Sequence, residues 1–157
     1  SAARTEPTLE EMAAKALAVL ERNKQGFFLM IEGGQIDWAG HQNDTGTMLH
    51  EMIKFDDALG YVLDWVMQRE DTLLIVTADH ETGAVTLEEG SVEDRSATLS
   101  YHSGSHSATM GPLLAAGPGA ERLGGIRTNA EIGRRLQTLL QEGAEGASGL
   151  HRARSAD

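Results

Sequence analysis

Acidic residues and histidines recur together along this 157-residue chain. The segment LLIVTADHETG carries a run of apolar residues directly into Asp79 and His80. The segment IEGGQIDWAGH contains Glu32, Asp37 and His41. Aspartate followed by histidine makes a poor turn, so the end of an apolar run is better explained as a rigid mount for reactive side chains than as a chain reversal. These residue types favour a site that binds cations.

Two more histidines, His102 and His106, lie in a loop rich in Ser and Gly. The chain contains no Cys, so any metal must be held by imidazole and carboxylate groups, which bind zinc at about 2.0–2.2 Å. Asp37 and His41 are four residues apart and can face one ion if their segment is helical. Each group alone is more simply explained as a local ion pair or a solvated histidine. Taken together, and placed at one end of a predicted sheet, these groups of acidic residues and histidines favour a metal site.

Composition limits the possible partners. The net charge of −11 argues against binding to nucleic acid, whose phosphates attract basic surfaces. No apolar run approaches the roughly 20 residues of a membrane helix, so we expect no membrane span. The first residues lack the apolar core of a signal peptide, so we expect none in this chain. An apolar content of 40% is that of one globular domain.

Helices and strands must position these acidic and histidine side chains, and the spacing of hydrophobic residues predicts where the helices and strands lie. Helices are expected from Thr8 to about Gly26, over 45–69 and after Thr128; strands are expected over 27–32, 73–76 and 112–117, with a further short strand in GAVTLEE. This order predicts an α/β fold with a mostly parallel sheet and helices on both faces, in which ligands bind beyond the carboxyl ends of the strands. We expect one domain over 1–142 and a flexible tail over 143–157.

Three motifs, GFFLMIEGGQIDWAGHQND, TADHETG and HSATMGPLLAAGPGA, together resemble the C-terminal half of a bacterial alkaline phosphatase. The resemblance covers about residues 8–140, with the motifs in the family's order. It implies part of an alkaline-phosphatase-like sheet. It also implies two zinc ions and one magnesium ion around a serine that is phosphorylated during the hydrolysis of phosphate monoesters.

The resemblance also assigns ligands to individual positions. The first zinc would be held by Asp37, His41 and His106, with His102 as the reserve for the third ligand. The second zinc would receive Asp79 and His80 from this segment, and the magnesium ion would receive Glu32.

The family's serine nucleophile, an acid that bridges two metals and a phosphate-binding arginine come from an N-terminal half that has no match here. The resemblance therefore implies a fragment without a catalytic nucleophile, inactive by itself, from a periplasmic or secreted enzyme. We expect it to self-associate or to pair with the N-terminal half, and a compact monomer in solution would contradict this. The alternatives are a non-catalytic zinc-binding module and a related phosphodiesterase or phosphomutase.

Overall fold

The structure is a computed structural model that describes residues 6–154, with side chains for residues 6–143. Its longer elements are α1 (Leu9–Leu20), α2 (Gln35–Gln42), α3 (Thr45–Met67), β1 (Leu74–Thr77), β3 (Thr86–Ser91), β4 (Ser96–Ser100), β6 (Leu113–Ala116) and α4 (Asn129–Arg154). The described structure also contains two short strands, β2 (Glu81–Thr82) and β5 (His106–Ser107), and a 3-10 turn, η1 (Ala120–Leu123).

The three longer helices, α1, α3 and α4, begin where the sequence predicts. At the start of α1 the Thr8 side chain accepts from the backbone N–H of Glu11, and the Glu11 carboxylate accepts from the backbone N–H of Thr8. This reciprocal pair satisfies two donors at a helix start that have no partner within the helix. Thr128 and Glu131 make the same pair before α4.

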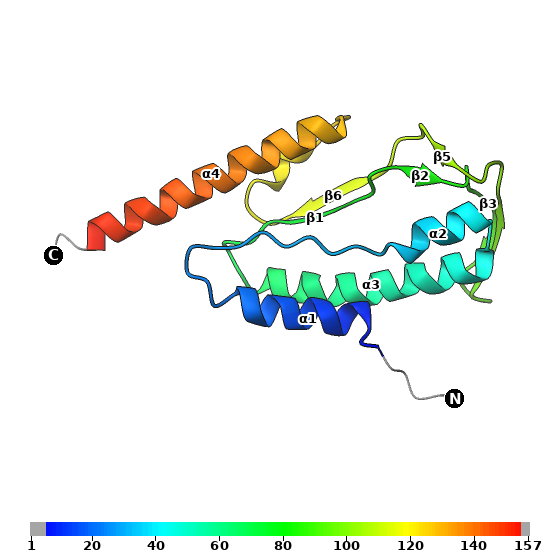
Figure 1. The fold of residues 1–157 in the computed structure, drawn as a ribbon, viewed down its shortest axis with the longest axis horizontal. Helices are drawn as coiled ribbons and strands as arrows, with labels where there is room; N and C mark the ends of the chain where they lie inside the picture. The colour runs from blue at the N-terminus through cyan, green and yellow to red at the C-terminus, as the bar shows by residue number, and fades with distance from the viewer. Residues whose placement is uncertain (1–5, 155–157) are drawn as a thin grey trace.

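The core lies between the helix pair α1–α3 and the extended chain above it (Figure 1). It is formed by small and branched side chains from one face of each helix, namely Ala13, Leu17, Val62 and Val66. Phe27, Leu29, Ile31, Trp65 and Leu74 pack against this cluster. Leu17 and Val66 belong to the apolar spacing that the sequence predicts for these helices, whereas Met12 and Met52 of the same spacing are 48% and 47% exposed.

The segment 27–32 was predicted as a strand, and this prediction is wrong for the described structure. The backbone there is extended but is not paired with any described strand. Its side chains alternate: Phe27, Leu29 and Ile31 contact the core, while Phe28 and Met30 are 61% and 78% exposed. Period-2 alternation needs only extended backbone, whereas a strand also needs a hydrogen-bonded neighbour.

The predicted mostly parallel sheet is also wrong. The described residues form three two-stranded sheets, β1–β6, β2–β5 and β3–β4, and all three are antiparallel. Parallel neighbours need a crossover connection, usually a helix. The chain between β1 and β6 contains only short strands and loops, so β6 returns antiparallel, with Leu74 opposite Ala116 and Thr77 opposite Leu113.

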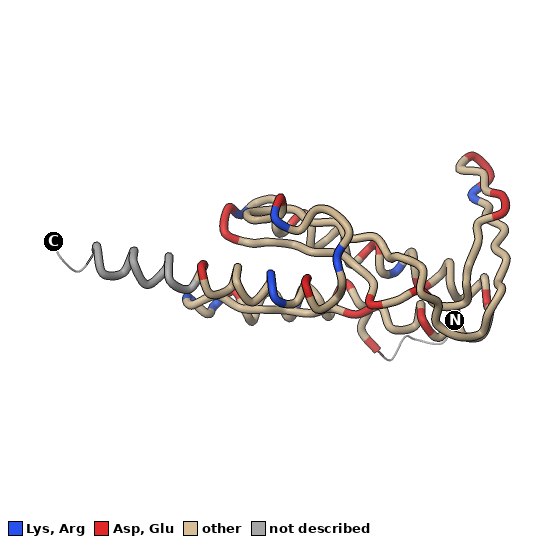
Figure 2. The backbone as a smooth tube through the Cα atoms, turned by 90° about the horizontal axis from the view of Figure 1, so that it is seen from above, with Lys and Arg blue, Asp and Glu red and all other residues tan. Residues whose placement is uncertain are grey.

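The segment 143–157 stays a predicted flexible tail. The backbone of α4 is helical as far as Arg154, and residues 155–157 lie outside the described part. The β3–β4 hairpin projects from the body of the molecule with acidic residues along it (Figure 2).

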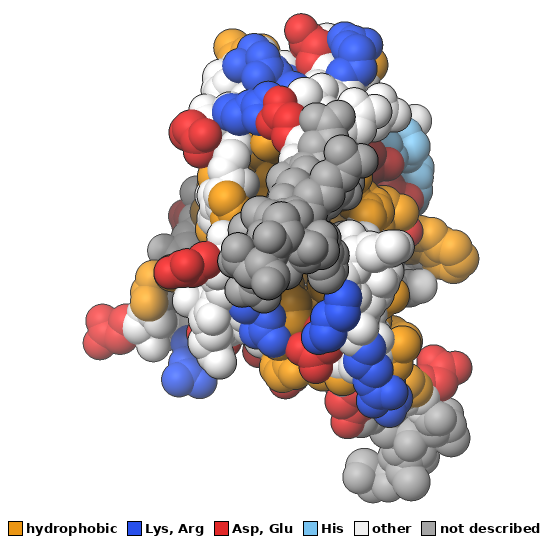
Figure 3. Space-filling view, turned by 90° about the vertical axis from the view of Figure 1, so that its left-hand side faces the viewer, with side chains coloured by type: hydrophobic (Ala, Val, Ile, Leu, Met, Phe, Trp, Pro, Cys, Tyr) orange, Lys and Arg blue, Asp and Glu red, His pale blue; other side chains and the backbone are white. Residues whose placement is uncertain are grey.

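Apolar side chains also reach the surface (Figure 3), among them Met110 and Leu114, which are 74% and 62% exposed. Self-association, or pairing with further chain, stays a prediction for this surface. Among the described helices, none combines the length and the apolar character that crossing a bilayer requires.

Candidate metal centre

Helix α2 presents Asp37 and His41 on one face. It spans eight residues and ends at Asn43, whose φ of 54° places it in the left-handed region that stops a helix. The i, i+4 spacing within it puts the two side chains one turn apart, with His41 Nε2 3.5 Å from Asp37 Oδ2. The sequence identified the pair but did not predict this helix, because it is too short for a clear apolar stripe.

The third side chain, His106, is positioned by a two-residue pairing between strands β2 and β5. Strand β5 pairs with β2 so that His106 lies opposite Thr82 and Ser107 lies opposite Glu81. The Glu81 carboxylate accepts from the Ser107 hydroxyl and, at 3.0 Å, from the backbone N–H of Val85. These hydrogen bonds lower the pKa of Glu81, with the Ser107 hydroxyl as the largest cause. The ladder fixes His106 beside α2, 65 residues further along the chain than His41.

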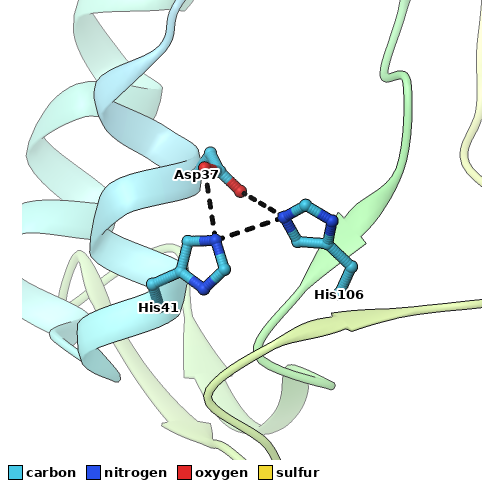
Figure 4. A group of neighbouring side chains, drawn as sticks. All are labelled: Asp37, His41 and His106. Atoms are coloured by element: carbon cyan, nitrogen blue, oxygen red, sulfur yellow. Dashed lines mark hydrogen bonds and ion pairs between the residues drawn. The ribbon is translucent and has the colours of Figure 1, made fainter.

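Asp37, His41 and His106 point at one another (Figure 4). His106 Nε2 lies 3.2 Å from His41 Nε2 and 3.6 Å from Asp37 Oδ1. Zinc bonds of about 2.0–2.2 Å in a tetrahedron would separate neighbouring ligand atoms by roughly 3.3–3.6 Å. The two imidazole nitrogens are 3.2 Å apart, and the two carboxylate oxygens of Asp37 lie 3.5 Å from that of His41 and 3.6 Å from that of His106, which is close to that spacing. The donor set therefore fits a zinc ion.

A backbone carbonyl orients His41. Its Nδ1 lies 2.9 Å from the carbonyl oxygen of Gly104, which can only accept a hydrogen bond. His41 must therefore carry a proton on Nδ1, so in the neutral ring the lone pair lies on Nε2, which faces the other two side chains. Histidines that bind metals commonly have this kind of outer hydrogen bond.

Asp37 is held in its charged form. The Thr82 hydroxyl donates to Asp37 Oδ1 at 2.6 Å, and this hydrogen bond is the largest cause that lowers the pKa of Asp37. His41, His106 and His80 lower the pKa of Asp37 further through their charge. An ionised carboxylate is the form that binds a cation.

His80 adjoins this group, and Asp79 adjoins His80. The ring of His80 stacks on that of His106, with centroids 3.5 Å apart and planes 20° apart. Asp79 Oδ2 lies 3.3 Å from His80 Nε2, and Asp79 Oδ1 accepts from the backbone N–H of His80 at 3.1 Å. The structure therefore brings His80 to the edge of the cluster, with Asp79 on its outer side.

Two further predicted residues lie apart from these contacts. Glu32 is exposed, and its carboxylate lies over Gly34, where an added Cβ would be 3.1 Å from Oε1. His102 is exposed, and its backbone N–H donates to the carbonyl of Gly83 at 3.0 Å. Among the described residues the triad that could hold a metal contains His106 and not His102.

Sequence reasoning missed Thr82 and the carbonyl of Gly104. A carbonyl carries no signal in the side-chain pattern. Thr82 did carry one, because residues i and i+2 of an extended segment share a face, so Thr82 lies on the same side as His80.

Comparisons with known proteins agree on one family. The family model described as alkaline phosphatase matches residues 1–98. The chain is 44% identical over 81 residues to alkaline phosphatase 4 of Bacillus subtilis, covering 52% of this chain and 18% of that protein. It is 35% identical over 132 residues to the human tissue-nonspecific isozyme, covering 82% of this chain and 25% of that protein.

Solved structures give the same result. The alkaline phosphatase of the Antarctic bacterium TAB5 is 38% identical with a TM-score of 0.77, covering 85% of this chain and 41% of that one. A mutant of that enzyme has Mg bound in the site called M3. A cold-active alkaline phosphatase from Shewanella sp., 24% identical with a TM-score of 0.77, shares the fold over 88% of this chain and 52% of that one. The chain thus spans about a fifth to a quarter of the curated relatives cited and about half or less of the solved ones, and it belongs to the alkaline phosphatase family.

Proposed function

We propose that this chain is the metal-binding part of an alkaline phosphatase that hydrolyses phosphate monoesters. The observation that carries the proposal is the convergence of Asp37, His41 and His106, whose ligand atoms lie within 4.8 Å of one another although they come from α2 and β5. Family membership supplies the reaction class, and the donor set supplies the reason for zinc.

In this proposal Asp37, His41 and His106 hold the first zinc, and Asp79 and His80 contribute to the second. Glu32 contributes an oxygen ligand to a magnesium site. Magnesium is a hard ion that prefers oxygen ligands. Two zinc ions, when bound, would supply charge neutralisation at the entering and leaving oxygens of an in-line phosphoryl transfer.

The chain's own residues orient and charge this centre. Thr82 keeps Asp37 ionised, and the Gly104 carbonyl holds the His41 ring with Nε2 turned inward. The serine that becomes phosphorylated would come from a part of the intact enzyme that precedes this segment. Family likeness also supports a periplasmic or secreted location, where such an enzyme meets phosphate monoesters.

A calorimetric titration of zinc into the metal-stripped chain tests the proposal. We expect about one tightly bound zinc per chain. His106→Ala should weaken this binding at least roughly a hundredfold, because one of three ligands is lost, more than the ten- to hundredfold typical of an outer partner.

His102→Ala is the matched control, since it removes another exposed histidine of the same loop and should leave the zinc affinity unchanged. Equal effects of the two substitutions would contradict the assignment of His106. Failure of the wild-type chain to bind zinc would contradict the proposal that this segment holds the first zinc.

A further inference from the structure

Thr82 is buried at the junction of α2 and the β2–β5 ladder. It is 9% exposed, and it is the one buried polar residue among those the structure describes. Its methyl and backbone pack against α2 at Gly40, where an added Cβ would lie 2.9 Å from the Thr82 carbonyl oxygen and 3.1 Å from its Cγ2. A purely structural contact at this place would need no hydroxyl group, so the orientation of the hydroxyl requires an explanation.

The Thr82 hydroxyl lies between the two clusters of acid and histidine. It is 2.6 Å from Asp37 Oδ1 on one side and 3.2 Å from His80 Nδ1 on the other. A threonine hydroxyl has one proton to give and lone pairs to accept with. The ionised carboxylate of Asp37 can only accept a hydrogen bond, so the hydroxyl of Thr82 donates to Asp37.

The tautomer of His80 follows from that assignment. Because the Thr82 hydroxyl donates its one hydrogen bond to Asp37, it can only accept from His80, so Nδ1 of His80 carries a proton and donates a hydrogen bond to Thr82. In the neutral ring the lone pair is then on Nε2, which lies 3.3 Å from Asp79 Oδ2. Two acceptors that face each other at this distance repel unless a proton or a cation lies between them.

We propose that Thr82 is a positioning residue that joins the two clusters: its hydroxyl fixes the carboxylate of Asp37 and selects the His80 tautomer whose Nε2 is available to a metal. The hydrogen-bond order is His80 Nδ1–H to the Thr82 oxygen and Thr82 O–H to Asp37 Oδ1. The part that concerns a metal rests on the proposed function, but the hydrogen-bond order does not.

Nitrogen-15 NMR of the histidine rings tests that order in the metal-stripped 157-residue chain. At about pH 9 imidazole rings are neutral, so each is in one tautomer or the other. The His80→Gln spectrum identifies the His80 signals. We expect His80 to carry its proton on Nδ1 in the wild type, and to move it to Nε2, toward Asp79, in Thr82→Val.

A wild-type His80 with its proton on Nε2 would overturn the proposal, because Thr82 would then donate to His80 rather than to Asp37. The same tautomer in the wild type and in Thr82→Val would also overturn it. If Thr82→Val does not fold, as judged by circular dichroism, the wild-type tautomer still decides the direction of the hydrogen bonds.

Zinc titration with two substitutions separates the hydroxyl from the packing. Thr82→Ser keeps the hydroxyl and removes the methyl that packs on Gly40, whereas Thr82→Val keeps the shape and removes the hydroxyl. We expect zinc affinity to fall roughly ten- to hundredfold in Thr82→Val and by less than about threefold in Thr82→Ser. A structural role would give the opposite order and would overturn the proposal.

Thr98→Val, at an exposed position of β4, is the matched control and should leave the zinc affinity unchanged. The two kinds of failure are distinguishable. If the wild-type chain binds no zinc, the proposed function fails, while the tautomer experiment still tests Thr82.

Discussion

Asp37 and Asp79 are both aspartates beside a histidine, yet the fold holds them differently. Asp37 is 35% exposed at its side chain and accepts a hydrogen bond from Thr82, 45 residues along the chain. Asp79 is 83% exposed, and its carboxylate contacts only its neighbour His80 among the described interactions. One carboxylate is fixed by a tertiary contact, and the other by the adjacent residue His80. Under the proposed function, this difference would mean that the first metal position is built within this segment and the second only partly so.

The largest expected effect follows from removing each carboxylate in turn. Asp37→Ala should weaken zinc binding at the first position at least roughly a hundredfold, because a ligand is lost along with its hydrogen bond to Thr82. Asp79→Ala should change that affinity by less than about threefold, since Asp79 reaches only His80. Isothermal titration with zinc at neutral pH measures both. A similar loss in the two variants would remove the distinction between the two regions.

A second prediction concerns the contact that fixes α2 against β2. Gly40→Ala would place a Cβ 2.9 Å from the Thr82 carbonyl oxygen and 3.0 Å from Thr82 Cβ. The helix must then move away from the ladder, and we expect the chain to lose about 1–3 kcal/mol of unfolding free energy, as for an overpacked core. Urea unfolding at 25 °C without zinc measures this loss.

Gly60→Ala in α3 provides the control, because nothing lies within 4 Å of the added Cβ. Alanine in the interior of a helix is favoured over glycine by roughly 0.5–1 kcal/mol, so this variant should be more stable than the wild type. If Gly40→Ala were stabilising as well, α2 would not be held by close contact with Thr82.

The smallest effect is expected at Asp44, a carboxylate held locally, as Asp79 is. It caps α3 by accepting from the Thr47 hydroxyl at 2.7 Å and from the Thr47 backbone N–H at 3.1 Å. These bonds, the hydroxyl first, lower the pKa of Asp44 below its ordinary value of 3.8. Since the folded pKa is lower than the unfolded one, the contribution to stability is present above pH 3.8 and is lost as pH falls through the folded pKa.

Asp44→Asn keeps a capping side chain that does not titrate. The wild type should therefore lose more stability than this variant when the pH falls from about 5 to about 2.5, measured as the shift of the urea midpoint. Equal shifts in the two proteins would show that the Asp44 cap makes no charge-dependent contribution.

The sequence by itself determined the residue types and most of the local structure. Periodicity located α1, α3 and the start of α4, and apolar runs located β1 and β6, because these signals depend on spacing along one chain. The same is true of the pair Asp37 and His41, whose i, i+4 spacing needs only one turn of helix.

The tertiary structure decided what spacing cannot encode. The segment 27–32 has the apolar pattern of a strand, but pairing depends on which backbone lies beside it, and β1 pairs with β6 in the antiparallel sense. The resemblance already named His106, with His102 in reserve, but its position beside Asp37 and His41 depends on the two-residue pairing between β2 and β5. The role of Thr82 depends on contacts at 2.6 and 3.2 Å across separate segments, and such distances exist only after the chain has folded.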